Sequence, residues 1–133
     1  LGIQVIYTRI DRDKKGRPAF TEHRFGVDAG RYFYPASTVK LPVAILALQW
    51  LNERKIPGLD KNATLITGVE GGRQTGVSND PSAPDGRPTI AHYIKKILLV
   101  SDNDAYNRLY ELLGQEYINH TLHRMGYQRQ PVV

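Results

Sequence analysis

The sequence contains no cysteine. This absence excludes a disulfide framework, a thiolate nucleophile and any zinc or iron–sulfur site with cysteine ligands. Long hydrophobic runs are lacking as well. The longest apolar stretch, residues 41–51, is interrupted by Pro42 and Gln49 and is far shorter than the roughly 18–20 residues that span a bilayer. No signal peptide is visible and the chain opens on Leu1, so we interpret it as a processed protein or a cut piece of one.

Enough apolar residues are present for one packed domain. The chain has 133 residues, of which 41% are hydrophobic and 23% charged, so wholesale disorder is not expected. The net charge of +5 is scattered along the chain, and we interpret the pair Lys95-Lys96 as the solvent side of an amphipathic helix. Because no aromatic residues are interleaved with basic ones, nothing indicates a nucleic-acid partner.

The first thirty residues have the pattern of a β-hairpin. Residues 3–10 alternate with apolar side chains on both faces, which predicts a strand covered on both sides. A charged turn with Gly16 and Pro18 follows, and a second strand is predicted over residues 19–27.

The remainder of the chain is predicted to be helical around one long loop. Apolar residues recur at helical spacing over residues 37–54, on so much of the circumference that this helix should be buried, with a kink or tightening at Pro42. A loop rich in Gly, Pro, Ser and Asn covers residues 68–88. Three further helices are then expected, from residue 89 to a break at 100–103, over 104–113 and over 115–125. A hairpin followed by helices indicates the α+β class.

The start of the most hydrophobic helix carries a candidate catalytic pair. Ser37 and Lys40 are three residues apart, so on a helix the lysine amine can reach the serine hydroxyl. Ser37 would lie in the first turn, where free backbone N–H groups and the helix dipole favour an oxyanion. The apolar residues after Lys40 should partly bury its amine, and a neutral buried amine can take a serine proton. The alternative is an N-terminal serine beside a surface lysine.

Ser101-Asp102-Asn103 is the second candidate. It falls at the break between two predicted helices, where a short non-helical segment can aim side chains into a cleft. The alternative is helix capping, since all three residue types are good N-caps. The occurrence of both motifs in one chain, each beside a hydrophobic helix, favours a catalytic role.

The segments YPASTVKLPVA, residues 34–44, and LVSDNDAYNRLYELLG, residues 99–114, resemble the class A β-lactamase and penicillin-binding-protein superfamily. The resemblance covers nearly the whole chain and includes LDKNATL at residues 59–65. It implies an α/β sandwich of the β-lactamase/transpeptidase-like fold. Residues 1–133 would form the N-terminal portion of the catalytic domain.

The resemblance implies a role for each motif residue. Ser37 would be the nucleophile that is acylated, and its backbone N–H would form one half of the oxyanion hole. Lys40 would activate Ser37 or relay its proton, and Ser101 would shuttle a proton towards the leaving nitrogen. Asn103 would hydrogen-bond the amide side chain of the substrate and steady Lys40, whereas Asp102 would hold the turn.

One motif of the superfamily has no counterpart here. The third motif, Lys-Thr-Gly or a close variant, is not found after Ser101, and Lys96 is the last lysine of the chain. Lys14-Lys15-Gly16 lies before the nucleophile and is not accepted as a substitute. The deacylating glutamate of class A enzymes, the second oxyanion donor and the C-terminal strands would lie beyond residue 133. We therefore interpret the chain as an incomplete N-terminal half, which a second chain or a C-terminal fragment would complete.

The leading hypothesis is a serine-dependent acyl-transfer hydrolase that opens β-lactams through an acyl-enzyme on Ser37, with no cofactor and no metal. The alternatives are a D-Ala-D-Ala peptidase of the penicillin-binding-protein type, a glutaminase with a similar Ser-x-x-Lys dyad, and a non-catalytic module that binds cell-wall fragments. The resemblance also implies a periplasmic or secreted location.

His120 and His123 are three residues apart on the last predicted helix and could share a metal ion. No third histidine or carboxylate is evidently placed to join them. An exposed helix face is the preferred interpretation.

Overall fold

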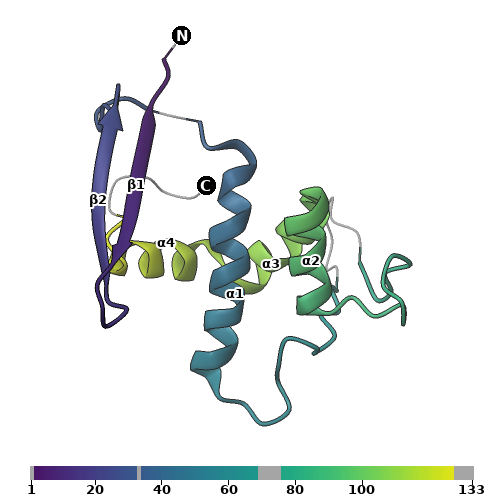
Figure 1. Ribbon diagram of the computed structural model, residues 1–133. Helices are drawn as coiled ribbons and strands as arrows, with labels where there is room; N and C mark the ends of the chain where they lie inside the picture. The colour runs from purple at the N-terminus through teal and green to yellow at the C-terminus, as the bar shows by residue number, and fades with distance from the viewer. Residues whose placement is uncertain (1, 33, 69–75, 128–133) are drawn as a thin grey trace. The chain divides into compact units, whose positions relative to one another are not determined.

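The computed structural model describes residues 2–32, 34–68 and 76–127. It consists of two compact units, residues 1–34 and residues 35–133, and each is described by itself. The first unit is a β-hairpin and the second is a group of helices with a long loop (Figure 1). Strands and helices occupy separate segments, so the chain belongs to the α+β class, as predicted.

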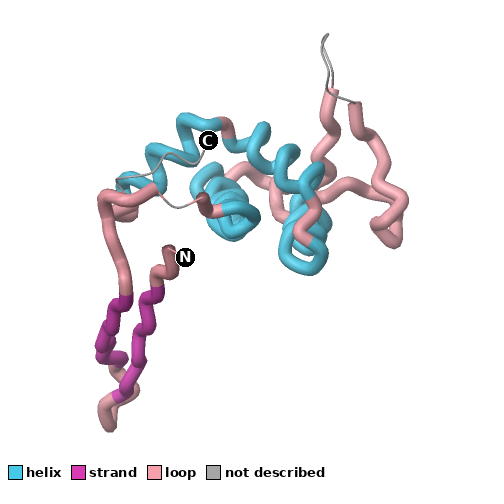
Figure 2. The backbone as a smooth tube through the Cα atoms, turned by 90° about the horizontal axis from the view of Figure 1, so that it is seen from above, coloured by secondary structure: helices cyan, strands magenta, loops and turns pink. Residues whose placement is uncertain are grey.

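The hairpin consists of strands β1 (Val5–Arg12) and β2 (Pro18–Phe25), which form a two-stranded antiparallel sheet. The two strands run side by side along their whole length (Figure 2). Asp13 fixes the turn between them, because its Oδ1 accepts hydrogen bonds from the backbone N–H groups of Lys15 and Arg17 at 2.8 and 2.9 Å. The charged turn predicted from the sequence is therefore confirmed.

Both faces of the hairpin are exposed, so the described residues do not supply the cover that the sequence predicts for the first strand. Every residue of β1 and β2 is exposed. The cross-strand partners Ile10 and Phe20 are 56% and 66% exposed. The alternation of apolar residues along a strand shows which faces are apolar but not which element covers them. The sheet formed by the described residues has only two strands.

Within the described residues, the helical unit contains one short 3₁₀ turn and four α-helices. The turn η1 (Ala36–Val39) leads directly into α1 (Lys40–Arg54), and α2 (Ile90–Val100), α3 (Asn103–Leu113) and α4 (Gln115–Arg124) follow the loop. These bounds lie close to the predicted ones. None of the described helices is both long and apolar enough to cross a membrane.

The helix predicted over residues 37–54 differs at its start, where η1 precedes α1. Pro42 lies in the first turn of α1. The first four N–H groups of an α-helix have no partner within the helix, so the donor that proline lacks is not missed there. The kink or tightening predicted at Pro42 is therefore wrong: α1 runs as one α-helix from Lys40 to Arg54, and the 3₁₀ turn lies before it.

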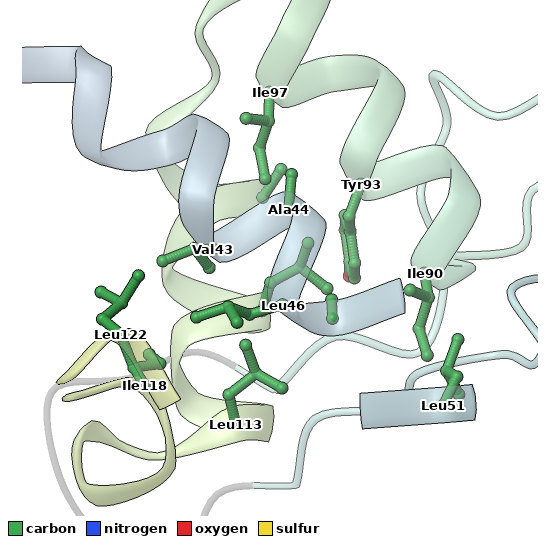
Figure 3. Close-up of a cluster of buried hydrophobic side chains, with 13 residues drawn as sticks. Val43, Ala44, Leu46, Leu51, Ile90, Tyr93, Ile97, Leu113, Ile118 and Leu122 are labelled. Carbon is green, nitrogen blue, oxygen red and sulfur yellow. The ribbon is translucent and has the colours of Figure 1, made fainter. Parts of the chain in front are cut away.

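The core of the helical unit lies where α1, α2, α3 and α4 meet. Figure 3 shows Val43 and Leu46 of α1 beside Leu113, Ile118 and Leu122 of α3 and α4. Each fully buried side chain of this size stabilises the folded state by roughly 1.5–3 kcal/mol. This core fixes the position of the first turn of α1 relative to the other helices.

One side of α1 is exposed, which corrects the prediction of a helix buried over most of its circumference. Leu41, Ile45 and Leu48 follow one another at helical spacing and are 52%, 53% and 40% exposed. The cause is geometric: apolar residues occupy two sides of α1, and the neighbouring helices cover one of them. We refer to these three residues as the α1 stripe.

The loop before α2 is held by backbone hydrogen bonds. Isolated β-bridges pair Thr64 with Thr89 and Thr67 with Val77. Thr89 is also the N-cap of α2, because its Oγ1 accepts the backbone N–H of His92 at 3.1 Å. These contacts fix the start of the helix whose other end carries the second motif.

Candidate active site

The start of α1 brings Ser37 and Lys40 together. Ser37 lies in η1 and is exposed, whereas Lys40 is the first residue of α1 and only 6% exposed. Lys40 Nζ lies 3.4 Å from Ser37 Oγ. An accessible hydroxyl therefore contacts a buried amine, which is the arrangement that the three-residue spacing predicts.

The turn between α2 and α3 presents Ser101 and Asn103. Ser101 follows the last residue of α2 with a left-handed backbone, φ 56°, and α3 begins at Asn103 rather than at the predicted residue 104. Asp102 is the N-cap of α3, and its Oδ1 accepts the backbone N–H of Ala105 at 2.8 Å. Asp102 thus holds the turn from within, as expected of it.

Lys40 joins the two motifs. Its Nζ donates to the backbone oxygen of Ser101 at 2.5 Å, to Ser101 Oγ at 2.9 Å and to Asn103 Oδ1 at 2.6 Å. Together with Ser37 Oγ, four oxygens surround a nitrogen that carries at most three hydrogens. The structure therefore brings together all four site residues predicted from the sequence, although the turn lies 61 or more positions after Lys40.

Two non-glycine residues with left-handed backbones flank the site. Ala36, immediately before Ser37, has φ 47°, and Ser101 has φ 56°. This conformation costs an ordinary residue about 1–2 kcal/mol, and it persists where the surrounding structure imposes it. At Ser101 the backbone N–H donates to the oxygen of Ile97 at 3.1 Å. A helix-end hydrogen bond therefore helps to hold the left-handed backbone at Ser101.

Asp80 and Lys96 form an ion pair beside the turn that the sequence analysis missed. Asp80 is 8% exposed, and its Oδ2 lies 3.0 Å from Lys96 Nζ, which in turn lies 3.5 Å from Asp102 Oδ2. The prediction that Lys95 and Lys96 both face solvent is right for Lys95 and wrong for Lys96. The reason is a partner in the loop 16 positions earlier, and no linear pattern signals such a pair.

The ion pair stabilises both of its charges. Burial alone would raise the pKa of Asp80, but hydrogen bonds from Ser82 and Lys96 outweigh it and hold that pKa well below its usual value. Burial alone would lower the pKa of Lys96, but the hydrogen bond to Asp80 and the charge of Asp102 raise it above the usual value. His92 completes the group, with Nε2 3.3 Å from Asp80 Oδ2 and 3.0 Å from Ser82 Oγ.

The other sequence candidates do not join the site. His120 and His123 are exposed on α4, and the part of the chain that the structure describes contains no group of three or more metal-ligating side chains. Lys14 and Lys15 lie in the exposed turn of the hairpin unit.

The site has a nucleophile and proton-transfer groups of the kind that an acyl transfer uses. Ser37 supplies an exposed hydroxyl, Lys40 a buried amine in contact with it, and Ser101 a second hydroxyl on the same amine. Such a set can remove a proton from a nucleophile and return one to a leaving group. Asn103 adds a side-chain amide on the same side of Lys40 as Ser101.

Comparison with known proteins identifies the family. The model of the beta-lactamase enzyme family matches residues 18–133, a range that includes both motifs. No curated protein and no solved structure gives a significant match to the chain.

Proposed function

We propose, from the premise that this chain belongs to the beta-lactamase enzyme family, that it is a class A-like β-lactamase with Ser37 as its nucleophile. The family makes the chain a β-lactamase-type serine hydrolase in the broad sense. The proposal adds a substrate class, the β-lactams, and a mechanism, an acyl-enzyme on Ser37. The observation that carries it is the position of Lys40 Nζ, 3.4 Å from Ser37 Oγ and 2.9 Å from Ser101 Oγ.

The first half of the reaction acylates Ser37. Its hydroxyl oxygen attacks the lactam carbonyl carbon while the Lys40 amine takes the hydroxyl proton. The lactam C–N bond then breaks, and the nitrogen receives a proton from the Ser101 hydroxyl. Lys40 returns a proton to Ser101 across their 2.9 Å contact. The proton lost by Ser37 thus balances the one gained by the leaving nitrogen, and the acyl group remains as an ester on Ser37.

The second half hydrolyses that ester with water and restores Ser37. Asn103 has a positioning role in both halves, because its Oδ1 accepts from Lys40 at 2.6 Å while its Nδ2 hydrogens can bind a carbonyl oxygen of the substrate side chain. Lys40 therefore contacts both the groups that transfer protons, Ser37 and Ser101, and the residue proposed to bind the substrate, Asn103.

A fluorescent penicillin tests the nucleophile in the intact protein. The unchanged protein is expected to form a covalent adduct, and Ser37→Ala is expected to form none because the attacking oxygen is gone. Lys40→Ala should slow acylation by roughly a hundredfold or more, the scale of a lost general base. Ser78→Ala, which changes an exposed serine of the loop, is the matched control and should acylate normally.

The lifetime of the adduct then separates the hydrolase from its alternatives. Rapid release with turnover supports a β-lactamase, whereas an adduct that persists for hours supports a D-Ala-D-Ala peptidase. An adduct that survives in Ser37→Ala would contradict the nucleophile assignment. No adduct in the unchanged protein would contradict the substrate class and favour the glutaminase or the non-catalytic module.

A further inference from the structure

We propose that Lys96 is a positioning residue for the candidate site: its ammonium holds Asp102, and with it the turn of residues 101–103, against Lys40. The kinetic consequence of this role rests on the proposed function. The structural role rests on the contacts around Lys96 alone.

Lys96 bridges two carboxylates, and the first of them is fixed. Lys96 Nζ lies 3.0 Å from Asp80 Oδ2 and 3.5 Å from Asp102 Oδ2. Asp80 is 8% exposed, and its Oδ1 accepts hydrogen bonds from the N–H and the hydroxyl of Ser82 at 2.9 and 2.6 Å. The Lys96 ammonium is therefore anchored on one side by the Asp80 carboxylate, which hydrogen bonds from Ser82 hold in place.

The second carboxylate, that of Asp102, belongs to the turn of residues 101–103. Asp102 directs Oδ1 to the N–H of Ala105 at 2.8 Å and Oδ2 to Lys96, while its own N–H donates to the backbone oxygen of Lys96 at 3.3 Å. The residues on either side of Asp102 supply three of the oxygens around Lys40 Nζ. A displacement of Asp102 therefore moves the groups that surround Lys40.

Charge determines which group would move. Without the ammonium, the carboxylates of Asp80 and Asp102 would face the same space. The other basic groups near it are His92, 3.3 Å from Asp80 Oδ2, and Arg108, which lines the same pocket as Asp80. Like charges repel more strongly where water is partly excluded. Asp80 is fixed by its own turn, so Asp102 is expected to move, and Ser101 and Asn103 with it.

Acylation by a fluorescent penicillin separates positioning from folding, because the amplitude counts folded sites and the rate constant reports their geometry. Lys96→Met is expected to lower the rate constant by at least about tenfold, the scale of a small misplacement of reacting groups. Lys96→Arg, whose guanidinium can contact both carboxylates, should keep most of the rate. Lys95→Met changes the exposed neighbouring lysine and should stay within about twofold of the unchanged protein.

The double variant Asp80→Asn with Lys96→Met distinguishes the two roles further. It removes both charges of the ion pair, so the amplitude should recover relative to Lys96→Met. The rate constant should recover only in part, because the repulsion by Asp80 is removed but Asp102 still lacks its cation. A rate constant that recovers fully, or a single Lys96→Met variant that acylates at the normal rate, would overturn the positioning role.

Hydrogen exchange supplies a readout that does not depend on activity. The amides of Asp102 and Ala105 should exchange at least about tenfold faster in Lys96→Met, while the amides of α1 should not change. If the unchanged protein takes no penicillin, the proposed function fails and this measurement alone decides. Unchanged exchange at the two amides, or an equal acceleration in α1, would show that Lys96 does not position the turn.

Discussion

Asp80 is the most deeply buried carboxylate among the described residues, and its surroundings keep it charged. Removing one partner of a buried ion pair costs roughly 3 kcal/mol or more, because the other charge stays buried without compensation. Exposed pairs such as Arg9 with Asp11 in the hairpin contribute little, because water screens them. Loss of one partner of the Asp80–Lys96 pair should therefore destabilise the helical unit more than loss of a surface ion pair destabilises the hairpin.

Stability should therefore fall in acid, and Asp80 should account for part of the fall. Its folded pKa lies well below the ordinary aspartate value near 3.9 of an unfolded chain. Below about pH 4 the unfolded chain binds a proton that the folded protein does not, so acid favours unfolding, by at most about 1.4 kcal/mol per pH unit for one proton.

Urea unfolding between about pH 6 and pH 3 measures this dependence. Asp80→Asn should give a smaller loss of unfolding free energy on acidification, because asparagine binds no proton in either state. Asp85→Asn, at an exposed aspartate of the same loop, should keep the slope of the unchanged protein. An unaltered slope in Asp80→Asn would contradict the lowered pKa.

The residues of the site differ in how far the sequence predicts them. Ser37 and Lys40 could be paired from their spacing, because residues three apart lie on the same side of a helix. The link from Lys40 to Ser101 and Asn103 came from the family resemblance, since no period connects residues separated by a long loop. Lys96 could not be assigned, because its role depends on a loop carboxylate that only the folded chain brings near.

At the scale of elements, the sequence predicted the positions of the helices well, but it did not predict which of their apolar faces are covered. Caps and apolar spacing place α2, α3 and α4 close to their predicted bounds. The same spacing could not show that the α1 stripe is exposed, because an apolar face has the same pattern whether or not another element covers it.

The N-cap of α2 provides a test at this scale. Thr89→Ala removes the oxygen that accepts the N–H of His92 and should lower the unfolding free energy by about 1 kcal/mol. Thr89→Ser keeps that oxygen and should lose much less. Chemical denaturation of the two variants measures the difference, and equal stabilities would mean that the cap bond contributes nothing.

At the scale of the whole molecule, many apolar side chains of the described residues are exposed. Both faces of the hairpin are exposed, and so is the α1 stripe. A two-stranded sheet is marginally stable in water, and its free edges can pair with another chain. We therefore expect these surfaces to be covered by another chain or segment.

Residues 1–133 produced alone should self-associate for this reason. Light scattering after size-exclusion chromatography should give a mass above 15.0 kDa that rises with concentration. The cross-strand pair Ile10 and Phe20 offers a matched variant, because Ile10→Glu with Phe20→Lys places opposite charges on partners that face each other. That variant should keep the hairpin and lower the measured mass. A well-behaved 15.0 kDa monomer of the unchanged chain would contradict the association.

The left-handed backbone of Ser101 links thermal stability to catalytic turnover, because the residue that would relieve the backbone strain lacks the serine hydroxyl. Glycine would adopt that conformation without strain, but it has no hydroxyl to carry a proton. Under the proposed mechanism, a lineage evolving towards higher temperature can therefore not place glycine at position 101 without losing the proton transfer proposed for Ser101. Position 36 carries the same strain on an alanine, whose methyl group performs no chemistry. Adaptation to heat should accordingly replace Ala36 with glycine and leave Ser101 as it is.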